Sequence, residues 1–150
     1  MISFQENEKW MLQAIRQANE ALNNKEVPIG AIIVKDGNIV GRGYNQVEGL
    51  NDSTAHAEIL AITSASSSLG DWRLNGSYLY VTKEPCLMCW GAINNARIEK
   101  VFYGLHSEEF GLDFIKDKLE SKMPHLKIIE GGILEFDCKK IIQDFFLKKR

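Results

Sequence analysis

Residues 29–40 read IGAIIVKDGNIV, and this stretch determines much of the architecture that we expect. Two runs of β-branched and aliphatic residues, 29–34 and 39–40, flank the dipeptide Asp36-Gly37. An Asp-Gly pair between two such runs is a strong signal for a tight β-hairpin. The stretch therefore predicts two adjacent antiparallel strands, the second of which should end near Asn45.

Helical and strand-like segments alternate around this hairpin. Before it, Ser3 and Glu6 have the spacing of a capping box, and apolar residues recur every three or four positions from Trp10 to Leu22. After it, we expect a helix capped by one of residues 52–54. The other expected segments are strands at 78–82, 101–103 and 126–129, and helices at 86–95, 108–120 and 138–146. This order predicts an α/β protein, a three-layer α/β/α sandwich around a five-stranded mixed sheet.

Length and composition predict a single domain covering residues 1–150, because domains most often have about 100–150 residues. Hydrophobic residues make up 45% and charged residues 25%, which is typical of a globular protein. No apolar run reaches the roughly 20 residues that span a bilayer, and residues 1–25 lack the apolar block of a secretory signal. We therefore expect a cytoplasmic protein without membrane contact.

Charge and cysteine content narrow the function further. A net charge of −2 is not typical of a dedicated nucleic-acid binder, so any such contact must come from local patches. The three cysteines are an odd number in a chain without a secretion signal, which favours metal binding or catalysis over disulfides.

Two short segments, 54–58 and 84–89, carry the residues with the clearest chemistry. Cys86 and Cys89 are three positions apart at the start of an expected helix, where the helix dipole favours thiolates. His56 would join them from the start of another helix. Nitrogen and sulfur ligands indicate zinc, and three protein ligands leave a position open for water, as in catalytic sites. Glu58 would be the general acid–base that carries protons during hydrolysis.

Simpler interpretations stay open at this point. Cys86 and Cys89 could be ordinary core thiols, or they could bind a structural zinc if Cys138 supplied a fourth ligand. Cys138, however, falls on the apolar face of the last expected helix. His106 and His125 lie in loop-like segments without ligand spacing, and we interpret both as surface histidines.

Taken together, His-x-Glu followed about thirty residues later by Pro-Cys-x-x-Cys resembles the signature of zinc deaminases. The chain resembles the cytidine/deoxycytidylate deaminase superfamily and, within it, the bacterial tRNA-specific adenosine deaminases. Most of the chain carries the resemblance, at residues 26–31, 45, 55–58, 72–74, 79–82, 84–86, 88–89, 91–93, 96–98, 103–104 and 145–146.

This resemblance implies a cytidine deaminase-like fold with one Zn²⁺ per subunit, a homodimer, and conversion of the wobble adenosine in a tRNA anticodon loop to inosine. The target base would be splayed out of the loop. The resemblance also implies that Asn45 contacts the target nucleoside and that four further residues shape the base pocket, namely Ala31, Ala55, Glu84 and Pro85.

Several positions depart from the tRNA-specific group. Residues 105–114 are acidic and apolar where an Asp-x-Lys-x-Gly-Ala-type loop that meets RNA is usual, and Lys83 replaces an apolar residue. The segment around Asp113 resembles guanine deaminases, in which an acidic residue recognises the free base. A basic cluster at 139–150 could contact phosphates, or it could simply complement the helix dipole. The alternatives are therefore a salvage deaminase of guanine, cytosine or guanosine, and an inactive binding subunit, which the presence of Glu58 disfavours.

Overall fold

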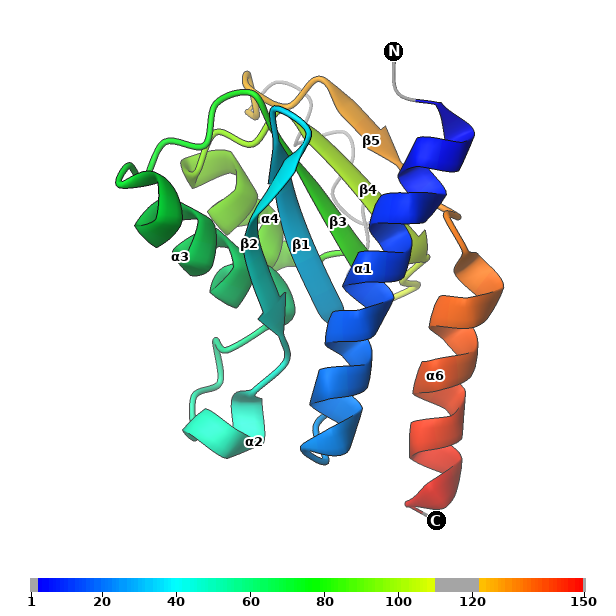
Figure 1. Ribbon diagram of the computed structural model, residues 1–150. Coiled ribbons are helices and arrows are strands. Elements are labelled where there is room, and N and C mark those ends of the chain that lie inside the picture. Colours follow the sequence, from blue (N-terminus) through cyan, green and yellow to red (C-terminus); the bar gives the residue numbers. More distant parts are fainter. Residues whose placement is uncertain (1–2, 110–121, 150) are drawn as a thin grey trace.

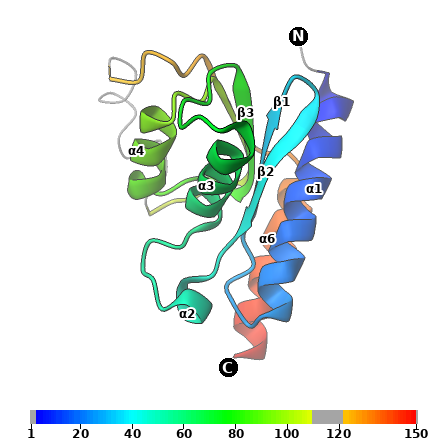
Figure 2. The same cartoon turned by 60° about the vertical axis from the view of Figure 1, so that its left-hand side comes forward.

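The computed structural model describes residues 3–109 and 122–149, and these residues build one sheet with helices on both faces (Figures 1 and 2). The elements are α1 (Phe4–Asn23), β1 (Gly30–Lys35), β2 (Asn38–Tyr44), α2 (Val47–Leu50), α3 (Ala57–Leu69), β3 (Ser77–Lys83), α4 (Leu87–Asn95), β4 (Lys100–Leu105), β5 (Ile128–Glu130) and α6 (Glu135–Lys148).

The strand order across the sheet is β2-β1-β3-β4-β5. β1 runs antiparallel to both β2 and β3, whereas β3, β4 and β5 run parallel to one another. α1 and α6 cover one face of the sheet, and α3 and α4 cover the other (Figure 2). The predicted three-layer sandwich with a five-stranded mixed sheet is therefore confirmed.

β1 lies between two hydrophobic cores, one on each face of the sheet, which explains its continuous apolar sequence. Ala31 and Ile33 pack in the core beneath α3 and α4, while Ile32 and Val34 pack in the core beneath α1 and α6. All four side chains are buried, as expected for a strand that is covered on both faces.

The hairpin forms where the sequence predicts it. Asp36 and Gly37 both have positive φ angles, 51° and 76°, as a two-residue type I′ turn requires. The N-cap prediction for α1 is also confirmed, because the Ser3 hydroxyl accepts a hydrogen bond from the backbone N–H of Glu6 at 3.1 Å.

The expected start of the second long helix was wrong. α3 begins at Ala57 with His56 as its N-cap residue, not at residues 52–54. The Asp52 carboxylate instead accepts hydrogen bonds from the N–H and hydroxyl of Thr54, at 2.9 and 2.8 Å, and stabilises a turn. The short helix α2 precedes this turn and was not predicted.

Two other segments, the loop between α3 and β3 and the segment after β4, also bear on the expectations from the sequence. Trp72 is 53% exposed, and the guanidinium groups of Arg73 and Arg97 lie over its ring. Most of the helix expected at 108–120 and Asp113 lie outside the described residues. Among the helices of residues 3–109 and 122–149, none has both the length and the apolar character needed to cross a membrane.

Candidate active site

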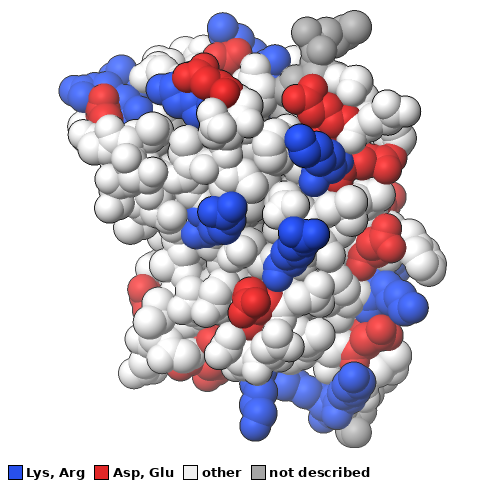
Figure 3. Space-filling view, in the orientation of Figure 1, with Lys and Arg blue, Asp and Glu red and all other residues white. Residues whose placement is uncertain are grey.

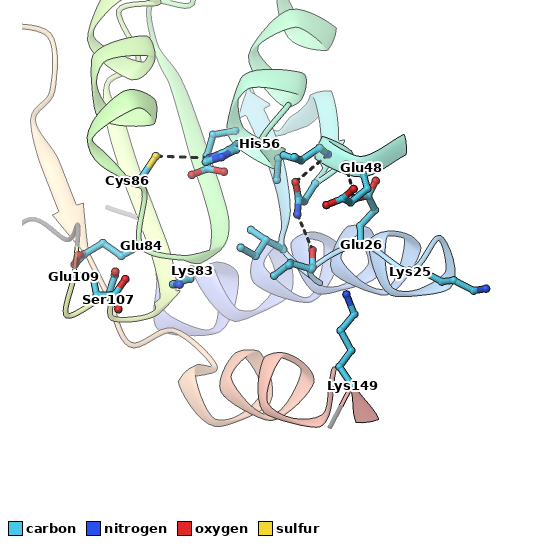
Figure 4. A pocket seen from close by; sticks show the side chains of 16 residues that line it. Lys25, Glu26, Glu48, His56, Lys83, Glu84, Cys86, Ser107, Glu109 and Lys149 are labelled. Atoms are coloured by element: carbon cyan, nitrogen blue, oxygen red, sulfur yellow. Dashed lines mark hydrogen bonds between the residues drawn. The ribbon is translucent and has the colours of Figure 1, made fainter. Parts of the chain in front are cut away.

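The first turns of α3 and α4 meet beside the end of β3 and bring three potential metal ligands together. His56 and Cys86 are the N-cap residues of these helices, and neither uses its side chain to cap its own helix. Cys89 follows in the first turn of α4 and is fully buried. Figure 4 shows His56 and Cys86 facing each other across the pocket.

The distances among these atoms fit a tetrahedral zinc ion. The Sγ atoms of Cys86 and Cys89 each lie 3.6 Å from Nδ1 of His56, and all three ligand atoms lie within 4.8 Å of one another. Zinc bonds of about 2.3 Å to sulfur and about 2.0–2.1 Å to nitrogen, at a tetrahedral angle, place sulfur and nitrogen about 3.6 Å apart. The donor set and its spacing therefore match zinc.

Neighbouring groups shift the pKa values of the Cys86 and Cys89 thiols in opposite directions. A hydrogen bond from the Cys89 thiol, together with contact to His56, lowers the pKa of Cys86 to about 4. The same contact with Cys86, together with burial, raises the pKa of Cys89 above its usual range. A bound metal would displace the proton held by the Cys89 thiol, because metal ligation requires deprotonated thiols.

Glu58 lies in the first turn of α3, where its side chain is only 4% exposed and lines the pocket. Burial raises the pKa of its carboxyl, as suits a group that must take up and release protons. On an ideal helix, residues two positions apart point in different directions. His56 has an extended backbone with ψ of 155°, however, so both side chains reach the same pocket.

A cavity of about 380 Å³ opens beside these residues. Asn45 lines it and is held from both sides: its Nδ2 donates to the carbonyl of Val27, and its Oδ1 accepts from the N–H of Val47, both at 3.3 Å. Glu84 also lines the cavity, whereas Ala31, Ala55 and Pro85 are buried without lining it.

Two residues around the pocket were missed by sequence reasoning. His106, interpreted as a surface histidine, is exposed, but its Nδ1 lies 2.9 Å from Oε1 of the buried Glu84. Glu26 is buried, and its two carboxylate oxygens accept hydrogen bonds from the N–H groups of Glu48 and Gly49 at 2.9 and 2.8 Å. The one signal for Glu26 in the sequence is that it belongs to residues 26–31, a segment that carries the family resemblance.

Cys138 is not part of the ligand group. It packs in the core beneath α1 and α6, on the opposite face of the sheet from α3 and α4, and burial raises the pKa of its thiol to about 12. Within the described residues, the His56 group therefore has three cysteine or histidine ligands and lacks the fourth that a structural zinc site needs.

Comparisons with known proteins agree with this chemistry. The family model of MafB19-like deaminases matches residues 5–150. A tRNA-specific adenosine deaminase of Streptococcus pyogenes serotype M1 is 43% identical over 99% of this chain and 88% of its own length.

Solved structures show the same relationship. A structure from work on A-to-I editing by tRNA:A34 deaminases is 39% identical, with a TM-score of 0.81, over 89% of this chain and 98% of that one. The guanine deaminase of Bacillus subtilis is 40% identical, with a TM-score of 0.65, over 75% of this chain and 76% of its own. The chain therefore belongs to the MafB19-like deaminase family, together with the tRNA-specific adenosine deaminases, and is a hydrolase that acts on C–N bonds.

Proposed function

We propose that this protein deaminates the wobble adenosine of tRNA to inosine, using one zinc ion held by His56, Cys86 and Cys89. The observation that carries the proposal is a ligand set with zinc spacing beside the buried carboxyl of Glu58, in a chain 43% identical to a tRNA-specific adenosine deaminase. In this proposal, residues 1–150 act as one catalytic domain in the cytoplasm.

Zinc would supply Lewis-acid activation, which makes water a nucleophile at neutral pH. Glu58 would take the proton of the attacking water and deliver it to N1 of the adenine as the water oxygen bonds to C6. It would then carry the second proton to the exocyclic nitrogen, and the C6–N bond breaks to release ammonia. The raised pKa of this buried carboxyl supports both halves of the transfer.

The pocket walls would position the base. We assign Asn45 to contact the nucleoside, because its amide is already oriented by hydrogen bonds on both sides. Glu84 would form the adjoining wall, fixed by its contact with His106. The predicted roles of Ala31, Ala55 and Pro85 would be indirect, behind this wall.

We also propose that the protein works as a homodimer. Leu87 and Met88 are 52% and 37% exposed in the first turn of α4, directly between the two cysteine ligands. Large apolar side chains beside a metal centre are costly to leave in water, and a second subunit would cover them. Analytical ultracentrifugation would test this assignment, and a Leu87→Lys variant should shift the protein towards monomer.

Free guanine is the second candidate substrate. The likeness to the Bacillus subtilis guanine deaminase, at 40% identity, favours it, as do the exposed carboxylates of Glu108 and Glu109, which would repel a phosphate backbone. An anionic rim is compatible with an uncharged free base.

Ammonia release by the zinc-loaded protein would separate the two candidates. The substrates would be an anticodon stem-loop RNA with adenosine at the wobble position, the same RNA with guanosine there, and free guanine, cytosine, adenosine and guanosine. Turnover of the adenosine RNA alone supports the proposal. Turnover of a free base or nucleoside without turnover of RNA would refute it and assign the protein to salvage.

A further inference from the structure

Charged side chains surround the opening of the cavity, and they are not distributed evenly. Three lysines and five glutamates line it: Lys25, Lys83, Lys149, Glu26, Glu48, Glu58, Glu84 and Glu109. By number alone, the carboxylates would make the opening repel an RNA backbone. Burial and hydrogen bonding change that conclusion.

Three of the five carboxyl groups are buried. Glu26 accepts two backbone hydrogen bonds, Glu84 lies 2.9 Å from His106, and the side chain of Glu58 is only 4% exposed. Only Glu48 and Glu109 are exposed to an approaching strand. The outer rim therefore carries three lysines against two carboxylates.

Lys149 and Lys25 lie on a different part of the rim from the exposed acid Glu109. Figure 4 shows Glu109, Ser107 and Lys83 toward one side of the pocket, and Lys149 and Lys25 toward the other. Figure 3 shows basic side chains gathered at the lower end of the molecule, where α1 and α6 end. The basic side of the rim is thus continuous with that end.

Lys83 and Lys149 come from distant parts of the chain. Lys83 ends β3, and Lys149 follows the last turn of α6. Within residues 3–109 and 122–149, neither lysine forms an ion pair; the ammonium of Lys149 lies over the ring of Phe145 at 4.6 Å. Both charges are therefore available to a ligand phosphate.

We propose that the RNA backbone beside the target nucleotide crosses the pocket opening over Lys83 and Lys149, which both line it. The inference rests on the proposed tRNA substrate. Lysine–phosphate contacts supply much of the affinity for RNA, and carboxylates within a Debye length of about 8 Å oppose it. In a chain of net charge −2, a local patch of this kind is required for RNA binding.

Salt-dependent binding tests the path directly. The Kd of zinc-loaded Glu58→Ala protein for the fluorescent stem-loop RNA would be measured between about 50 and about 200 mM KCl, and each lysine contact to single-stranded RNA adds about 0.7 to the log–log slope. Over this range of salt, the Kd of Lys83→Gln and the Kd of Lys149→Gln should therefore each increase about 2.6-fold less than the Kd of the parent protein. Glu109→Gln should tighten binding.

Lys35→Gln is the matched control. Lys35 is also half-buried at a strand end, but it pairs with Ser77, at the opposite end of β3 from Lys83. Six residue steps along β3 separate Ser77 from Lys83 by about 20 Å, well beyond the Debye length. Its slope should equal that of the parent. Unfolding curves of all variants would confirm that they are folded.

The outcomes separate this inference from the proposed function. Lower slopes for both lysine variants, with an unchanged slope for Lys35→Gln, support the path. Slopes that do not change in a protein that edits RNA would overturn the path and leave the tRNA proposal intact. Absence of RNA turnover by the wild-type enzyme would overturn both.

Discussion

Replacing Gly43 by alanine should push the start of α3 away from the sheet. Gly43 lies on β2, directly beneath the first turns of α3. A Cβ atom built on it would lie 2.4 Å from the carbonyl oxygen of Ala57 and 2.5 Å from the amide nitrogen of Ala61. Both atoms belong to the helix backbone, which cannot rotate away as a side chain can.

The magnitude follows from these distances. Cβ contacts below 3.0 Å essentially never occur, so the helix must retreat by at least about 0.6 Å, and by about 1 Å to reach ordinary contact. Overpacking of this kind costs about 1–3 kcal/mol of folding stability. Because α3 carries His56 and Glu58, the same shift of about 1 Å should lower turnover by about 10²-fold.

Gly30→Ala provides the control. Its Cβ would lie 2.2 Å from the carbonyl oxygen of Ala14, so it displaces α1, which carries none of the proposed zinc ligands. Urea unfolding would measure stability, and ammonia release at a temperature where each variant is folded would measure kcat. If Gly43→Ala lost no more kcat than Gly30→Ala at equal folded fraction, the argument that β2 sets the position of His56 and Glu58 would be refuted.

Four further outcomes are expected. Glu58→Gln should retain zinc, measured by elemental analysis, but lose about 10²–10⁴-fold in kcat, because no group then carries the protons. Cys86→Ala should lose zinc and activity together, since two protein ligands do not hold the ion at a catalytic site. Zinc affinity should fall on acidification, because the hydrogen bond to Cys86 raises the pKa of His56 and protons then compete with the metal from a higher pH; chelator competition across pH measures this. Glu26→Ala should lower stability by about 1.5–3 kcal/mol and raise KM, because α2 loses its anchoring carboxylate.

Each of these outcomes has an opposite result that would count against it. Near-normal kcat in Glu58→Gln would exclude the proton-carrier role, and full zinc occupancy in Cys86→Ala would exclude this residue as a ligand. A chelator titration that does not depend on pH would contradict proton competition at His56. Glu20→Ala, an exposed change on α1, is the control for Glu26→Ala, and equal stability of the two variants would contradict the anchoring role.

Much of the fold was predictable because the signals are local. The Asp36-Gly37 turn, the capping box of α1 and the alternation of strands and helices all depend on residues within one turn or one strand. Local signals failed where a polar side chain had two possible partners. Asp52 could have capped a helix, but it stabilises a turn, and His56 became the N-cap instead.

The candidate ligands and Glu58 were also predictable, because residue type and spacing limit which metal chemistry is possible. His56, Cys86 and Cys89 could be named as a group from the sequence, and the structure brings their ligand atoms within 4.8 Å. Trp72 shows the limit of such reasoning. Large aromatic side chains are usually mostly buried, but the Trp72 ring lies at the surface against the cations of Arg73 and Arg97.

By itself, the sequence determined the fold class and singled out the candidate ligand set and the candidate acid–base residue, since each depends on short-range periodicity, turn chemistry or motif spacing. Only the tertiary structure placed His106 against Glu84, Glu26 beneath α2, and Lys149 on the same rim as Lys83. These contacts join residues that are far apart in the chain. They depend on how the layers pack and on which buried polar groups need partners, and neither condition can be read from a local pattern.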